Sequence, residues 1–157
     1  MIKVIYTVAV SLFLLSCSSK PQKNYDVTTL QTISYALLDL ADRKRQMEQY
    51  EQALMLYNET ESYALKRNDR VTAGLSQLKR AAIHIQLNQI NTAQQLINDV
   101  NSSVEYESVP LGNAVILLQA QLAKAEGNAE FAGQLLKQLE QEFKDDFEKR
   151  RYYQLVG

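Results

Sequence analysis

The chain of 157 residues contains one cysteine, one histidine, two prolines, five glycines and no tryptophan. A single cysteine has no partner for an internal disulfide, and a single histidine does not complete the usual sets of zinc ligands. Lys and Arg number 17 against 18 Asp and Glu, so the basic excess that binding to a phosphate backbone requires is missing. We therefore expect no disulfide, no metal site and no nucleic-acid partner.

Patterns that indicate catalysis are also missing. The sequence has no glycine-rich phosphate loop and no spacing typical of metal ligands. His84 lies within an apolar stretch, which favours a packed histidine over a general base. Asp145 and Asp146 belong to a charged run that is typical of a solvated helix end. We expect no enzymatic activity, no cofactor and no small-molecule substrate.

Residues 1–16 combine one cation, Lys3, with an apolar run from Val4 to Leu15. As a helix that run would span about 18 Å, which is shorter than the roughly 30 Å hydrocarbon core of a bilayer. This arrangement predicts a cleaved signal peptide, not a permanent transmembrane helix.

The segment Leu14-Leu15-Ser16-Cys17 resembles the lipobox of bacterial lipoproteins, with Leu15 larger than the residue usual at that place. The resemblance implies cleavage before Cys17 and a covalent lipid on its thiol. In that family an Asp after the cysteine marks retention in the inner membrane, whereas this chain has Ser18. The resemblance therefore implies an anchor in the outer membrane, on the periplasmic face. The stretch from Ser18 to Asp26 has few apolar residues and one proline, which predicts a flexible tether up to residue 26.

From Val27 onward Leu, Ala, Gln, Glu and Lys dominate, and the alternation typical of strands is almost absent. The composition predicts one all-α domain over 27–157. Breaks rich in Asn, Gly or Pro divide it into six helices. The expected helices cover residues 28–46, 48–67, 70–88, 91–102, 110–126 and 128–149. The expected N-caps or near-caps are Asp69, Asn91, Ser108 and Asn128.

Alanines repeat at a fixed spacing along this domain. The two members of each pair are twelve residues apart, and successive pairs are offset by 40 and then 39 residues. The pairs are Ala41 with Ala53, Ala81 with Ala93, and Ala120 with Ala132. A small residue on each of two packed helices lets the backbones approach closely where they cross. The spacing therefore predicts three helical hairpins, and the alternative is an ordinary helical bundle in which Ala recurs because it is common.

The pattern over about 34–143 resembles the tetratricopeptide repeat, and Gly127 to Ala132 is most like that family's turn into its second helix. The resemblance implies a short solenoid of about three antiparallel hairpins in a right-handed superhelix. The offsets exceed the usual period of about 34 residues. We expect the extra residues between hairpins, at 68–72 and 103–112.

In this family the first helix of each hairpin lines a concave face that binds a peptide or a helix. The positions implied here, which we name the groove residues, are Tyr35, Leu38, Asp42, Arg45, Gln46, Gln86, Gln121 and Lys124. Apolar neighbours of the groove residues are Leu75, Leu78, Ala82, Ile85, Ala114, Leu117 and Ala125. The apolar neighbours have a second interpretation, packing between helices, which we prefer for the middle hairpin.

The resemblances together imply an adaptor that binds an envelope protein or peptide in pilus, secretion or cell-wall assembly. Two alternatives stay open, an accessory regulator that recruits an enzyme such as a peptidoglycan hydrolase, and a structural scaffold without a groove ligand. Residues after Phe143 are expected either to cap the last hairpin or to present an aromatic and basic patch.

The lipid anchor makes a testable prediction. Two or three acyl chains, at about 0.8 kcal/mol per buried methylene, hold a protein durably on a membrane. The substitution Cys17→Ala removes the acylated thiol, so we expect the protein to leave the membrane fraction. Fractionation of cells followed by immunoblotting measures this, and unchanged retention of the variant would refute the anchor.

Overall fold

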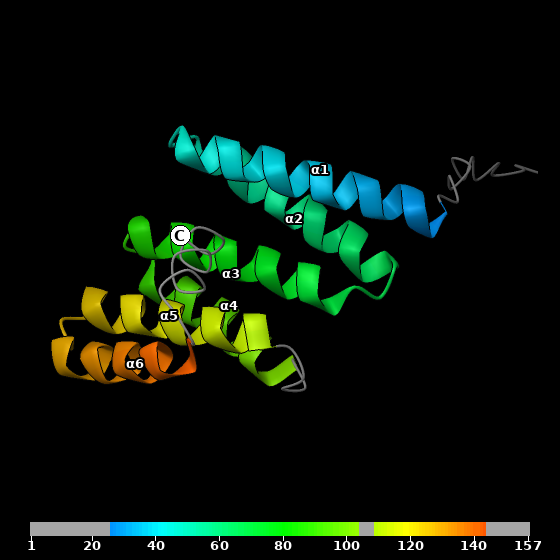
Figure 1. Cartoon of the computed structure of the whole chain (residues 1–157). Helices are drawn as coiled ribbons and strands as arrows, with labels where there is room; N and C mark the ends of the chain where they lie inside the picture. The colour runs from blue at the N-terminus through cyan, green and yellow to red at the C-terminus, as the bar shows by residue number, and fades with distance from the viewer. Residues whose placement is uncertain (1–25, 104–108, 144–157) are drawn as a thin grey trace, which may run out of the picture.

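The computed structural model describes residues 26–103 and 109–143, which form six helices and no strand. The helices are α1 (Val27–Gln46), α2 (Tyr50–Lys66), α3 (Arg70–Gln86), α4 (Ile90–Ser103), α5 (Val109–Ala125) and α6 (Ala129–Glu142) (Figure 1). The prediction of an all-α fold is confirmed. Four predictions lie outside the described residues. They are the signal peptide, the lipidation of Cys17 with most of the tether, the cap at Ser108, and the role of the chain after Phe143.

Helix boundaries agree with the sequence to within two residues, except at the end of the last helix. The expected helix 128–149 is wrong at its C-terminus because α6 ends at Glu142, and Phe143 is extended with φ −89° and ψ 128°. A run of good helix formers does not fix where a helix ends, since propensity is a weak preference that tertiary context overrides. Asp69 and Asn128 cap α3 and α6 as expected, whereas Asn91 lies inside the first turn of α4.

The same tight turn connects four pairs of helices. After α1, the N–H of Glu48 donates to the Arg45 carbonyl and the N–H of Gln49 donates to the Lys44 carbonyl, at 2.9 Å each. These are the two hydrogen bonds of a Schellman motif, with Glu48 in the left-handed region at φ 57°. The same bonds recur in three further turns, whose left-handed residues are Asn68, Asn88 and Gly127. Only one of the four turns has a glycine at the left-handed position, although glycine adopts this conformation without steric cost.

The expectation of extra residues at 68–72 is wrong. Only residues 67–69 separate α2 from α3, and α3 already begins at Arg70. The helices α2, α3 and α4 begin at residues 50, 70 and 90, so one helix with its turn occupies twenty residues. The longer first offset therefore comes from longer helices, because the connection between the first two Ala pairs is as tight as the turns within them. The second stretch in which extra residues were expected, 103–112, contains residues 104–108, which lie outside the described residues.

Apolar side chains form two clusters that meet at α3. Each helix packs on the next helix along the chain, and α5 also contacts α3 (Figure 1). Ala41, Ala53, Tyr57 and Ile83 form the cluster of the first three helices. The larger cluster takes Leu78, Ile97, Leu118 and Leu139, among others, from α3 to α6. Both clusters contain α3 side chains, so α3 joins them.

All six repeated alanines are buried. Ala41, Ala53, Ala81 and Ala93 are 0% exposed, Ala120 is 2% exposed and Ala132 is 5% exposed. Burial of both members of every pair is what close helix crossings require.

A larger side chain at one of these alanines tests the close packing. We expect Ala93→Leu to lower the free energy of unfolding by about 1–3 kcal/mol, because overpacking displaces neighbouring side chains. Gln94→Leu, at the adjacent exposed position, is the control and should change stability by no more than about 0.5 kcal/mol. Urea unfolding of the two variants measures the difference, and equal stabilities would contradict a tight crossing at Ala93.

Candidate functional site

The groove residues divide into an exposed set and a set held within the protein. The exposed ones are Tyr35, Gln46, Gln86, Gln121 and Lys124, whereas Leu38, Asp42 and Arg45 are half-buried. Several of the apolar neighbours are buried, namely Leu78 (0% exposed), Ala82 (7%), Ala114 (0%) and Leu117 (4%). These apolar side chains pack between helices, so a partner would meet mainly the polar groove residues.

Asp42 binds two side chains from neighbouring helices. The Tyr57 hydroxyl of α2 donates to Asp42 Oδ1 at 2.5 Å, and Lys79 Nζ of α3 donates to the same oxygen at 2.9 Å. The Lys79 side chain is 5% exposed and the Asp42 side chain 31%. Asp42 therefore links α1 to α2 and α3. Its Oδ1 already accepts two hydrogen bonds from side chains of the protein itself.

Burial changes the proton affinity of both partners of Asp42. It raises the pKa of the Tyr57 phenol, and the hydrogen bond donated to Asp42 raises that pKa further. Burial also lowers the pKa of the Lys79 ammonium, against the opposing attraction of Asp42. Because the folded state keeps the Tyr57 proton, this contribution to stability is present below the ordinary pKa of 10.0 and is lost as pH rises above it. At neutral pH the phenol is a neutral donor.

A second polar contact joins α2 and α3 at Glu61, which lies one helical turn after Tyr57 on α2. Arg80 Nη1 donates to Glu61 Oε2 at 2.7 Å, and Gln77 Nε2 donates to Glu61 Oε1 at 2.5 Å. The side chains of Arg80 and Glu61 are 23% and 15% exposed. The Glu61 carboxylate is thus neutralised by a cation and bound by an amide, which fixes the relative position of the two helices.

Tyr35 rests against the turn between α2 and α3. The Arg67 guanidinium lies 5.1 Å from the centre of the Tyr35 ring and also pairs with Asp69. The pKa of Tyr35 is lowered, mainly by a hydrogen bond with Gln31 and to a smaller extent by the contact with Arg67. Although Tyr35 is 48% exposed, one face of its ring is occupied by Arg67. A partner would therefore reach Tyr35 mainly from its free side.

Sequence reasoning missed Lys79. This cation lies four residues after Leu75 and four before Ile83, on one face of α3. A charge on a face with such neighbours is the signal that would have indicated a buried ion pair. His84 is half-buried, as expected for an interfacial histidine, and its Nδ1 lies 2.5 Å from Gln89 Oε1.

Comparison of the chain with protein-family models, with curated proteins and with solved structures gives no match. Among residues 26–103 and 109–143, no group of three or more His, Cys, Asp and Glu side chains could hold a metal ion. Over the same residues no helix combines the length and apolar character needed to cross a bilayer. The geometry of the described helices is therefore the basis for a functional proposal.

The Asp42–Lys79 pair makes a prediction about stability. Lys79→Met removes the cation and leaves a partly buried carboxylate, so we expect a loss of about 1–3 kcal/mol in the free energy of unfolding. The double variant Asp42→Asn with Lys79→Met should lose less than the sum of the single variants, because the two side chains interact. Denaturant unfolding measures the free energy of unfolding of Lys79→Met, of Asp42→Asn and of the double variant.

Lys124→Met, at an exposed lysine of α5, controls for loss of a positive charge and should stay within about 0.5 kcal/mol of the parent. If Lys79→Met and Lys124→Met cost the same, the buried pair does not hold the helices together.

Proposed function

We propose that this protein is a lipid-anchored adaptor on the periplasmic face of the outer membrane, where it binds an envelope protein through a row of polar side chains. Cys17 carries the lipid, residues 17–26 form the tether, and residues 27–157 form a tetratricopeptide-like array. In this array α1 with α2, α3 with α4, and α5 with α6 are three stacked antiparallel hairpins.

Packing and turn geometry support the arrangement as hairpins. A three-residue turn joins the two helices of each proposed hairpin, and the partners contact one another. The helix α5 also contacts both helices of the preceding pair. Such contacts between neighbouring units are what a stacked array needs to bury a continuous core.

The position of four exposed groove residues carries the proposal. Gln46 and Gln86 are the last residues of α1 and α3, and Gln121 and Lys124 lie in the last turns of α5. These ends point to the same side of the molecule, on the left in Figure 1. We name these four residues the polar row.

The chemistry of the polar row suits a peptide segment. A glutamine side chain offers one carbonyl acceptor and two N–H donors, which match the unpaired backbone groups of an extended peptide. Lys124 adds one positive charge that would orient an acidic group of the partner. Asp42 contributes indirectly, because its hydrogen bonds with Tyr57 and Lys79 hold α1 against α2 and α3.

Crosslinking in cells tests the polar row. The variant with Gln86→Ala, Gln121→Ala and Lys124→Ala should recover at least about tenfold less of the envelope partner than the parent, since each residue would contact it directly. Its matched control carries Gln94→Ala, Gln95→Ala and Lys137→Ala, which are exposed positions of α4 and α6.

Asp42 is left unchanged in this experiment because its replacement would disturb the contact with Lys79. The comparison requires equal unfolding temperatures of the two triple variants. Equal recovery of every crosslinked protein from both variants would show that Gln86, Gln121 and Lys124 do not bind the partner, and would contradict the proposal.

A further inference from the structure

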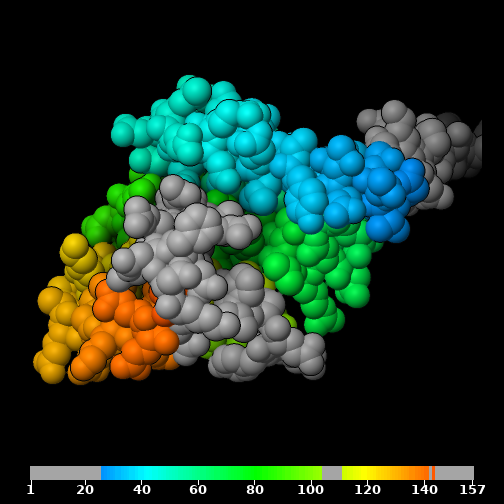
Figure 2. All heavy atoms as spheres, viewed as in Figure 1, coloured from blue at the N-terminus to red at the C-terminus, as the bar shows by residue number. Residues whose placement is uncertain are grey.

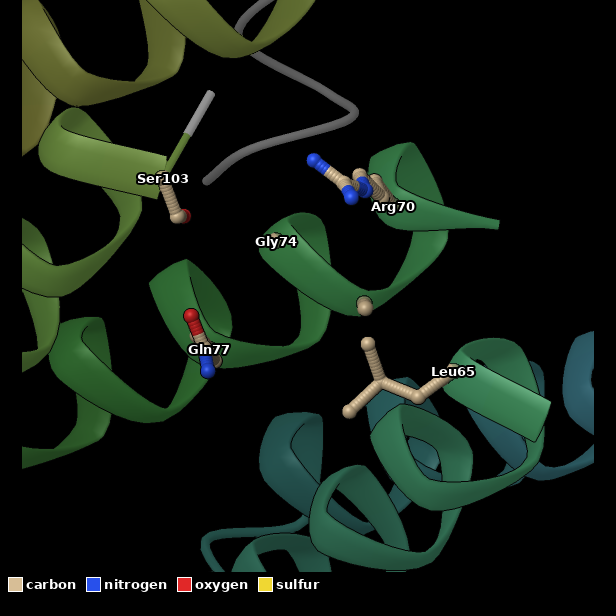
Figure 3. A pocket seen from close by; sticks show the side chains of 6 residues that line it. Leu65, Arg70, Gly74, Gln77 and Ser103 are labelled. Carbon is tan, nitrogen blue, oxygen red and sulfur yellow. The ribbon is translucent and has the colours of Figure 1, made fainter. Parts of the chain in front are cut away.

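A pocket opens where the end of α2, the start of α3 and the end of α4 meet (Figure 3). Its volume is about 310 Å³, and its lining residues are Leu65, Arg70, Ala73, Gly74, Gln77 and Ser103. None of them is a groove residue. Arg70 begins α3 and Gln86 ends it, so these two residues lie about 24 Å apart along that helix. Gln77, the lining residue of α3 nearest to Gln86, lies about 14 Å from it along the helix.

One wall of the pocket is apolar. Leu65 extends from α2 toward α3 in Figure 3 and is 55% exposed. Gly74 is buried, and a Cβ there would lie 3.2 Å from Leu111 Cδ1 of α5. A side chain at Gly74 would therefore crowd α5, and α3 contributes only the small residues Ala73 and Gly74 to this part of the lining. An exposed leucine beside a depression gives an apolar side chain of a ligand something to pack against.

The opposite wall carries polar groups of complementary kinds. Arg70 is exposed and is the one ionisable side chain among the six lining residues. The Ser103 hydroxyl donates to the Val100 carbonyl at 3.2 Å, which leaves its oxygen able to accept. Gln77 donates one N–H to Glu61, and its amide oxygen is an acceptor. The nearby acid, Glu61, is neutralised by Arg80, so the positive charge of Arg70 dominates the pocket.

We propose that this pocket binds the C-terminal residue of a peptide, with an apolar side chain against Leu65 and the free α-carboxylate on Arg70. An arginine fork matches a carboxylate through two parallel hydrogen bonds. The oxygens of Ser103 and Gln77 accept the last backbone N–H groups of the peptide. A volume of about 310 Å³ is near the lower limit for ligand sites, which suits one or two side chains.

A terminal peptide accounts for more of the lining than a fatty carboxylate does. A fatty acid would use Leu65 and Arg70 but would leave the acceptors of Ser103 and Gln77 facing its methylene chain. Desolvating acceptors without a donor is unfavourable. The pocket shares no residue with the polar row. A test of peptide binding in the pocket is therefore independent of a test of the proposed function.

Fluorescence anisotropy with the purified protein tests the site. The probe is the peptide Ser-Gly-Ser-Leu with fluorescein on its N-terminus, compared with the same peptide as a C-terminal carboxamide. We expect saturable binding of the free acid below about 1 mM and at least about tenfold weaker binding of the carboxamide. Arg70→Glu should weaken binding of the free acid at least about tenfold, and Leu65→Ala by about threefold or more.

Two matched variants serve as controls. Lys137→Glu makes the same charge change at an exposed position of α6, and Leu87→Ala removes a leucine that is 41% exposed after α3. Both should bind the free acid within about twofold of the parent. Equal binding of acid and carboxamide, an unchanged affinity of Arg70→Glu, or displacement of no probe by unlabelled peptide would overturn the proposal. So would binding of decanoate without binding of the peptide, which would assign the pocket to a lipid.

Discussion

The helix α3 has to pack on two sides, and the rest of the structure depends on that constraint. Leu78, Ala81 and Ala82 belong to the cluster shared with α4, α5 and α6, whereas Ile83 belongs to the cluster shared with α1 and α2. A surface helix has a single apolar stripe and buries one side only. Because α3 is buried over more of its circumference, it joins two cores, and α1 and α2 attach to the remaining helices chiefly through it. In Figure 2 the blue and cyan atoms of α1 lie along the top of the molecule, above the green atoms.

Polar links along α3 add direction to this packing. Apolar contacts are not directional, so a helix pair can slide or rotate until a polar group fixes it. The bonds of Lys79 to Asp42 and of Arg80 to Glu61 connect α3 to α1 and α2 at two places. Burying Lys79 carries a desolvation cost, which the Asp42 carboxylate offsets only in part, since the pKa of Lys79 stays lowered. We interpret these links as positional constraints on the first two helices more than as a source of stability.

Two chemically different surfaces lie at opposite ends of α3. The polar row gathers where α1, α3 and α5 end, and the pocket lies where α3 begins. The polar row has amides that suit backbone groups in the middle of a peptide, whereas the pocket has one cation and an apolar wall that suit a chain terminus. Under the two proposals made above, the polar row and the pocket bind different peptide segments at the two ends of α3.

The sequence by itself determined the helices, because helix formers and the Asn, Asp and Gly signals at the breaks act over a few residues. It also identified the alanines that become buried, since their spacing repeats. Glu48 in a left-handed turn and the end of α6 at Glu142 were not foreseen, because neither residue carries a strong local signal. Only the tertiary structure decided that Asp42 is engaged while Gln86 is exposed, and that Leu65, Arg70 and Ser103 line one pocket. The physical reason is distance along the chain, since the partners of Asp42 lie 15 and 37 residues away and meet it only when the helices pack.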